Sequence, residues 1–358
     1  MASELDSLTR ILIRDYVRFT EGNMILLYDD NTRQIHESII DAVDMNGDGY
    51  VDAINIDTYR KDKSMPEKIP DEMSQRMHSL LSRNKDPQKN VLLYIFHTRE
   101  GEAPFRKQLI NEFSPYGKVG GLPKCTPQLL KSSYIASYNP DFVLELEEFL
   151  NNQPEIVIKD DAGTNLKIEF DTTKYKFVRS DGILLPHKYA NPIPAEVYTY
   201  PANAEGTMYI RSLYAPFLDL DEYKSDPQRL IKELNKDPLI WTINNGEITR
   251  VQCNNQFFLE QGKIEVFERD PVYGKKFGEL GHAANMEGNL TGDFGSDEKK
   301  RIHGANGDGY KPRTNAPYES KVHADGLIIN ATLYSPKLGK NYMVNDTYNP
   351  DVFKTLRK

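Results

Sequence analysis

Apolar residues in the first part of the chain recur with two different spacings, which predict alternating helices and strands. Residues 3–20 follow a helical spacing, whereas Met24–Tyr28 is a short apolar run between polar turns. The same alternation continues through four further segments, at residues 31–43, 51–56, 70–83 and 91–96. Buried strands separated by helices are typical of a parallel sheet. We therefore predict an N-terminal, doubly wound α/β domain over residues 1–152.

The pattern changes after residue 150, where Asn151-Asn152-Gln153-Pro154 marks a natural break. Short strand-like segments follow, at residues 155–159, 166–170, 195–200, 207–211, 239–243, 247–251 and 322–333. Gly and Pro turns separate these segments, and a helical pattern lies around residues 225–236. Such an arrangement favours antiparallel pairing. The sequence therefore predicts a second, mainly antiparallel β (α+β) domain over residues 153–358.

The composition is that of a folded globular protein, with 39% hydrophobic and 27% charged residues in a chain of 358. A formal net charge of −8 argues against nucleic acid or an anionic membrane as a partner, because binding phosphates needs clustered Lys and Arg. Cys125 and Cys253 are far apart, which excludes a thiolate cluster and favours a reducing compartment. We expect a cytoplasmic protein with no nucleic-acid or membrane partner.

The first sign of chemistry is the triplet His323-Ala324-Asp325, in a segment predicted to be a strand. Alternate residues of a strand point to the same face, so the imidazole and the carboxylate would lie side by side. Such a pair suits a divalent cation. Taken alone, the triplet is also compatible with a simple salt-linked histidine.

Other residues able to bind a metal lie upstream of this pair, namely Glu196, Glu279, Glu298 and His303. Three Glu, two His and one Asp are enough ligands for two divalent ions that share a bridging carboxylate. Glu279 lies in Gly278-Glu279-Leu280-Gly281, where glycine lets the backbone approach a ligand. Each Glu taken alone is equally compatible with a solvated surface position.

Together these residues belong to a set of motifs that resembles the aminopeptidase T and aminopeptidase S type of metallopeptidase, the thermophilic aminopeptidase family. The resemblance runs from about residue 155 to 335 and is fainter in the N-terminal half. Its motifs are Val157–Leu166 with Gly163-Thr164-Asn165, Asn191–Val197 followed by Gly206-Thr207, Gly278–Gly281, Asp297-Glu298-Lys299 with His303 and Tyr310, and His323-x-Asp325.

The resemblance implies a metal-dependent aminopeptidase that holds two divalent ions, Zn²⁺ or Co²⁺. The ligands it implies are Glu196, Glu279, Glu298, His303, His323 and Asp325. It further implies that Glu279 bridges the ions or acts as general base, and that the Tyr310 phenol stabilises an oxyanion. The expected reaction is hydrolysis of an N-terminal peptide or related amide bond by a metal-activated water. The substrate is expected to be a peptide or another small molecule, and the protein a homodimer.

The sequence departs from this family at several positions, which leaves the substrate and the reaction open. Ala195 stands where the family has glycine before the first Glu, and His282 interrupts an aliphatic pattern. Lys311-Pro312-Arg313 adds basic charge near the predicted site.

A second interpretation rests on the ferrous dioxygenases that open 2,5-dihydroxypyridine, which resemble these aminopeptidases in fold. His303, His323 and Asp325 would then form the facial triad of a single Fe(II) ion. The remaining carboxylates would be neighbours or spectators, and retention of the whole ligand set with Tyr310 favours the hydrolase. A third interpretation is a biosynthetic protein on the same scaffold that binds a peptide or small molecule without turning it over.

Overall fold

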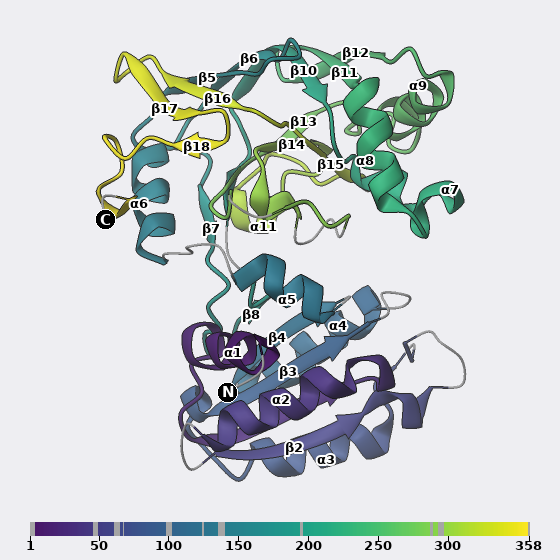
Figure 1. Ribbon diagram of the computed structural model, residues 1–358, viewed down its shortest axis with the longest axis vertical. Coiled ribbons are helices and arrows are strands. Elements are labelled where there is room, and N and C mark those ends of the chain that lie inside the picture. The colour runs from purple at the N-terminus through teal and green to yellow at the C-terminus, as the bar shows by residue number, and fades with distance from the viewer. Residues whose placement is uncertain are drawn as a thin grey trace. The chain divides into compact units, whose positions relative to one another are not determined.

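The chain divides into two compact units (Figure 1). The computed structural model describes residues 4–45, 49–60, 65–66, 68–97, 102–123, 125–134, 140–193, 196–286, 289–292 and 297–356. The first unit comprises Met1–Ile135 and Asp181–Pro194, and the second comprises Ala136–Ser180 and Ala195–Lys358. This division differs from the single boundary after residue 152 that the sequence predicts. The helix over residues 140–151 belongs to the second unit, and the segment 181–194 belongs to the first.

The first unit is built on a parallel five-stranded sheet with the strand order β2-β1-β3-β4-β8. Its strands are β1 (Gly22–Tyr28), β2 (Gly49–Asn55), β3 (Asn90–Phe96), β4 (Lys118–Pro123) and β8 (Tyr189–Ala190). Its helices are α1 (Glu4–Ile11), continued by a π-helical segment Leu12–Val17, α2 (Arg33–Asp44), α3 (Asp71–Leu81), α4 (Glu102–Phe113) and α5 (Pro127–Tyr134).

Helices cover both faces of this sheet, which is why its central strands are almost continuously apolar. All of β3 is buried, and Leu92 belongs to the same buried cluster as Met73 and Met77 of α3 and Leu109 of α4. Helix α2 contacts β1 and β2, and α1 contacts α2 and α5. The predicted doubly wound α/β arrangement is therefore confirmed.

The second unit contains two antiparallel sheets. The larger has the order β12-β11-β10-β6-β5-β16-β17-β18, and the smaller β15-β14-β13-β9-β7. The strands of the larger sheet are β5 (Glu155–Lys159), β6 (Asn165–Glu169), β10 (Asn203–Ile210), β11 (Leu239–Asn244), β12 (Glu247–Gln252), β16 (Thr332–Ser335), β17 (Lys340–Val344) and β18 (Thr347–Tyr348). Those of the smaller sheet are β7 (Val178–Ser180), β9 (Glu196–Thr199), β13 (Phe277–Ala283), β14 (His303–Gly307) and β15 (His323–Leu327). The helices of this unit are α6 (Pro140–Asn151), α7 (Asp221–Lys224), α8 (Pro227–Lys236), α9 (Gln256–Lys263) and α11 (Lys311–Thr314).

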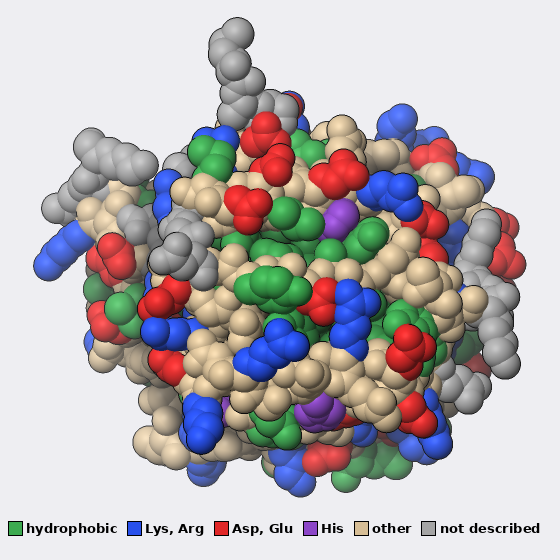
Figure 2. Space-filling model, turned by 90° about the horizontal axis from the view of Figure 1, so that it is seen from below, with side chains coloured by type: hydrophobic (Ala, Val, Ile, Leu, Met, Phe, Trp, Pro, Cys, Tyr) green, Lys and Arg blue, Asp and Glu red, His purple; other side chains and the backbone are tan. Residues whose placement is uncertain are grey.

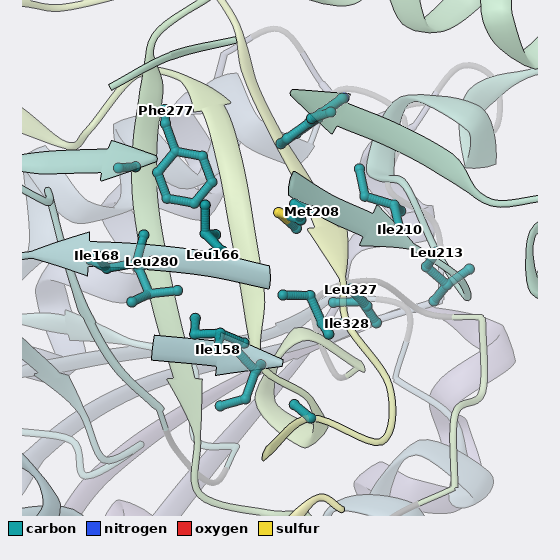
Figure 3. Close-up of a cluster of buried hydrophobic side chains, with 14 of the residues drawn as sticks. Ile158, Leu166, Ile168, Met208, Ile210, Leu213, Phe277, Leu280, Leu327 and Ile328 are labelled. Atoms are coloured by element: carbon teal, nitrogen blue, oxygen red, sulfur yellow. The ribbon is translucent and has the colours of Figure 1, made fainter. Parts of the chain in front are cut away.

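The two sheets enclose the main hydrophobic core of this unit, part of which Figure 3 shows in close-up. Ile158 and Ile168 of the larger sheet face Leu280 and Leu327 of the smaller one, together with the fully buried Trp241. The smaller sheet thus has one face fixed by apolar packing. Its other face is free to carry polar side chains.

Several features of the second unit differ from the prediction, including the short strands β7, β17 and β18, which lie outside the predicted segments. The segment 322–333 was predicted as one strand, but it forms β15 and β16 in different sheets, with Asn330 between them in the left-handed region (φ 58°). Strands β13 and β14 were not predicted at all. Their sequences are rich in Gly, His and Asn, which lack the β-branched and aromatic residues typical of strands.

The surface carries charges of both signs. On the face drawn in Figure 2, acidic and basic side chains surround a central group of hydrophobic ones. Interspersed charges are consistent with a modest net charge of −8. Within the described parts of the chain, no helix is both long and apolar enough to span a bilayer.

His282, noted in the sequence as unusual, lies on the core face of β13 and is fully buried. Its Nε2 atom is 3.0 Å from the hydroxyl oxygen of Tyr342. Burial lowers the pKa of His282 to about 3. The imidazole is therefore neutral in the folded protein and serves the packing between the sheets.

We expect a His282→Gln variant to lose stability at pH 8, by about 1–3 kcal/mol, because a buried polar contact is removed. Between pH 6.5 and 3, His282 is protonated in the unfolded chain but stays neutral in the folded protein. The free energy that His282 contributes to folding above pH 6.5 is therefore lost as the pH falls. The stability gap between native protein and variant should therefore narrow on acidification. Urea unfolding followed by the fluorescence of Trp241, the single tryptophan, measures this gap; a gap independent of pH would contradict it.

Candidate metal centre

Four adjacent strands of the smaller sheet bring predicted metal ligands together on the face away from the core. Glu196 begins β9, Glu279 lies on β13, His303 begins β14, and His323 and Asp325 lie on β15. These strands are neighbours in the order β15-β14-β13-β9. Five of the six predicted ligands therefore come from residues up to 129 positions apart, from Glu196 to Asp325, held by one hydrogen-bonded sheet.

Small residues on the neighbouring strands leave space for the side chains of the candidate ligands. Ala305 of β14 is the register partner of both Glu279 and Asp325, and Gly281 is that of His303. A Cβ atom on Gly281 would lie 1.9 Å from His303 Nε2, so the imidazole sits directly over the glycine. The second glycine of the Gly278–Gly281 motif is needed for this close approach.

The first glycine of the same motif forms a β-bulge. The register between β13 and β14 shifts between Phe277 and Glu279. A Cβ atom on Gly278 would lie 2.3 Å from the carbonyl oxygen of Gly307, so only glycine fits there. The extra residue lets Phe277 enter the core while Glu279 turns to the opposite face.

Glu279 stands between two groups of potential ligands that share it. Its Oε1 atom is 3.5 Å from His303 Nε2, and its Oε2 atom is 3.9 Å from His323 Nε2. Glu196 Oε2 lies 3.4 Å from His303 Nε2, and Asp325 Oδ2 lies 3.2 Å from His323 Nε2. Ligands about 2 Å from a tetrahedral ion lie roughly 3.4 Å apart, so each group has the spacing of a divalent site.

Several carboxylate oxygens of these groups are buried without a hydrogen-bond partner among the described residues. They are Glu196 Oε2, Glu279 Oε2 and Asp325 Oδ1. Burying such oxygens is costly unless a donor or a cation compensates them. The donor set therefore fits divalent cations at this position.

Both imidazoles are oriented by backbone carbonyls. His303 Nδ1 lies 3.1 Å from the carbonyl oxygen of Arg301, and His323 Nδ1 lies 2.8 Å from that of Asp308. A carbonyl can only accept, so each Nδ1 carries the hydrogen and donates it. In the neutral rings, the lone pair of each Nε2 then faces the carboxylates, as a metal ligand requires.

The electrostatics of the cluster favour cations. Burial raises the pKa of Glu279 and raises that of Glu298 to about 7. Although burial alone would lower it, Glu279 and Glu196 raise the pKa of His303 to about 10. Protons are therefore held where negative charge is concentrated, and divalent ions would compete for the same positions.

Glu298 lies beside the two groups but belongs to neither. Its Oε1 atom accepts a hydrogen bond from Lys299 Nζ at 2.8 Å, and the same ammonium donates to Glu196 Oε1 at 2.7 Å. The Lys299 side chain is only 5% exposed, and the two carboxylates raise its pKa despite burial. The role of Glu298 as a ligand remains a prediction.

Lys299 is a buried member of the site that was not predicted from its sequence. Its only signal is its position next to Glu298, and a lysine beside acidic residues is usually solvated. The short turn that carries it is held by neighbouring bonds: Lys300 Nζ pairs with Asp297 Oδ1 at 3.0 Å, and the Lys299 carbonyl accepts from Asn285 N at 3.1 Å. The ammonium is therefore fixed in place.

Tyr310 lies at the edge of the cluster. Its ring centroid is 4.5 Å from that of His323, and the residue is 40% exposed. The backbone is in the left-handed region (φ 53°), and the Tyr310 carbonyl accepts from Arg313 N and Thr314 N. A strained conformation held in this way is typical of residues whose side chain must point in a set direction.

Further polar groups adjoin Tyr310. Arg313 Nη1 donates to the hydroxyl of Tyr198 at 3.0 Å, and the Tyr198 ring centroid lies 5.8 Å from that of Tyr310. Although 40% of the residue is exposed, desolvation of its hydroxyl beside the cluster, followed by the charges of Glu279 and Asp325, raises the pKa of the Tyr310 phenol above its usual value. The phenol is therefore a proton donor at neutral pH.

No protein-family model matches the sequence, and a search of curated proteins found no match either. Among solved structures, the 2,5-dihydroxypyridine dioxygenase from Pseudomonas putida KT2440 is similar, with a TM-score of 0.62 and 12% identity over 98% of both chains. Wild-type AmpT from Thermus thermophilus also has a TM-score of 0.62, with 13% identity over 96% of this chain and 98% of that one. Identities this low show a shared fold, so the chemistry must be argued from the site.

We expect Gly281→Ala to weaken metal binding by roughly 10-fold or more, because the new methyl group displaces the His303 ring. Binding of Zn²⁺ to metal-free protein, followed by calorimetry, measures the effect. Gly262→Ala is a control away from the cluster, because this glycine of α9 likewise has no positive φ and a Cβ atom there would meet only the flexible side-chain ends of Leu239 and Val251. Equal Zn²⁺ affinity in native protein and Gly281→Ala would contradict the placement of His303.

Proposed function

We propose that this protein is a metal-dependent hydrolase that cleaves an N-terminal peptide bond, or a related amide bond, of a peptide or small molecule. The supporting observation is the position of Glu279, whose two oxygens face the Nε2 atoms of two different histidines. A carboxylate in that position is suited to bridge two divalent ions, Zn²⁺ or Co²⁺. The fold shared with AmpT is consistent with this proposal.

The residues of the site would have different roles in such a reaction. Bound divalent ions would polarise the scissile carbonyl and lower the pKa of the attacking water. Glu196 and His303 would hold one side of the centre, and His323 and Asp325 the other. Glu279 would be the shared ligand, because its two oxygens face the Nε2 atoms of two different histidines.

Tyr310 supplies the remaining function in this proposal. Its phenol stays protonated at neutral pH, because burial and nearby carboxylates raise its pKa. A protonated phenol beside the ligand His323 can donate a hydrogen bond to the oxyanion that develops during amide hydrolysis. The backbone bonds at Tyr310 keep this donor in position before the substrate binds.

The geometry supports the hydrolase over a mononuclear iron dioxygenase. A facial triad would require His303, His323 and Asp325 to bind one ion. Among the described residues, the two histidines instead fall in different groups, with Glu279 between them. The fold does not discriminate, because both similar structures have the same TM-score of 0.62.

Removing a ligand should abolish both metal retention and activity. We expect Asp325→Asn and His323→Ala, assayed on aminoacyl p-nitroanilides and short peptides after loading with Zn²⁺ or Co²⁺, to lose activity roughly 100-fold or more. His187→Ala, which changes an exposed histidine of the first unit, should behave like the native protein. Native protein that binds no divalent metal, or that cleaves an aromatic ring with one Fe(II) and oxygen, would refute the proposed function.

Tyr310→Phe tests the oxyanion role separately. The variant keeps the ring against His323 and removes only the hydroxyl, so metal content should not change. The value of kcat is expected to fall by about 100- to 1,000-fold, the cost of losing one oxyanion donor. Steady-state kinetics and metal analysis of the same preparation distinguish an oxyanion role from a metal-binding role. A fall in metal content would contradict the oxyanion role and would make Tyr310 a metal ligand.

A further inference from the structure

The two ligand groups that share Glu279 differ in their charge environment. We call Glu196, Glu279 and His303 the Glu196 subsite, and Glu279, His323 and Asp325 the Asp325 subsite. The ammonium of Lys299 is already paired with one carboxylate oxygen of the Glu196 subsite, at 2.7 Å. In the Asp325 subsite, the ion pairs of the ligand carboxylates are with the imidazoles of the centre.

The ion pair with Lys299 occupies a carboxylate oxygen of Glu196 that could otherwise bind a metal ion. Glu196 Oε1 is bound to Lys299, which leaves only Oε2 directed at His303. Glu298, the further carboxylate expected at this centre, is also bound to Lys299, at 2.8 Å. The Glu196 subsite therefore offers fewer free oxygens than its composition suggests, whereas Asp325 Oδ1 has no hydrogen-bond partner among the described residues.

Lys299 cannot simply move away when an ion arrives. Its side chain is 5% exposed, and the turn that carries it is tied down by the buried Lys300–Asp297 pair. Withdrawing the ammonium would leave Glu298, a largely buried carboxylate (22% exposed) that belongs to neither ligand group, without its partner, which is unfavourable. A divalent ion in the Glu196 subsite must therefore bind next to a fixed positive charge, and Coulomb repulsion in a buried site is large.

We propose that Lys299 makes the metal centre unequal. The Asp325 subsite holds one divalent ion tightly, and the Glu196 subsite takes a second ion weakly and exchangeably. This inference rests on the proposed metal-dependent function. In addition, the Lys299 ammonium supplies part of the positive charge that a second divalent ion would otherwise bring to the centre.

Titration of the full-length, metal-free protein with Co²⁺ tests the inference without any variant. Calorimetry and the visible absorption of Co²⁺ should show two steps per chain, with affinities that differ on the order of 100-fold. Asp325→Asn should remove the tight step, and Glu196→Gln only the weak one. Two equally tight ions, or loss of the tight step in Glu196→Gln, would overturn the inference and leave the proposed function standing. Absence of any Co²⁺ binding would overturn both.

The charge of Lys299 can also be removed directly. Lys299→Met should tighten the weak step roughly 10-fold or more, whereas Lys299→Arg should leave it weak. Lys300→Met is the matched control, because this neighbouring buried lysine pairs with Asp297 rather than with a candidate ligand. An unchanged second step in Lys299→Met, or the same tightening in Lys300→Met, would show that the charge of Lys299 does not set the difference.

Discussion

The mutual repulsion of buried carboxylates is the constraint on which the candidate site depends. Glu196, Glu279, Glu298 and Asp325 meet on or beside one face of the smaller sheet, three of them with oxygens that find no donor among the described residues. Such a cluster would push its strands apart unless something rigid held them. The rigidity comes from the other face of the same sheet, where Leu280 and its neighbours are locked in the hydrophobic core. The core does more than stabilise the fold, since it holds together a face on which several carboxylate oxygens lack a hydrogen-bond donor among the described residues.

The sequence could predict the fold class because that class depends on periodicity. Short apolar runs such as Val91–Phe96, bounded by polar turns, are typical of strands buried on both sides, and the structure buries the whole of β3. Two of the four strands that carry the site, β13 and β14, were not found by the same argument. In β14, His303–Gly307 is made of small and polar residues, because the residues beside each ligand must be small enough to admit it. Because the site requires small and polar residues at these positions, β14 lacks the β-branched and aromatic residues by which a strand is recognised in a sequence.

The candidate residues themselves could be predicted by their type and motif, since few side chains bind divalent ions. Their geometric grouping, with Glu279 shared and Glu298 beside a lysine, could not. Lys299 was missed because a lysine becomes part of a buried site only through partners distant in sequence, here Glu196, 103 residues away. His282 shows the converse, because a residue type able to bind metal turned out to face the core. Which side of a strand a residue occupies depends on register, and β13 contains a bulge.

That bulge at Gly278 has a consequence for how β13 can evolve. The strand serves two environments at once, with Leu280 and His282 on one side and Glu279 and Gly281 on the other. Because side chains alternate along a strand, adding or deleting one residue beyond the bulge would exchange the two sets, sending the shared carboxylate into the apolar layer. The length of β13 is therefore constrained separately from the requirement for glycine at positions 278 and 281. Homologous proteins that keep this cluster of candidate ligands should carry no insertions or deletions between the bulge and the end of the strand.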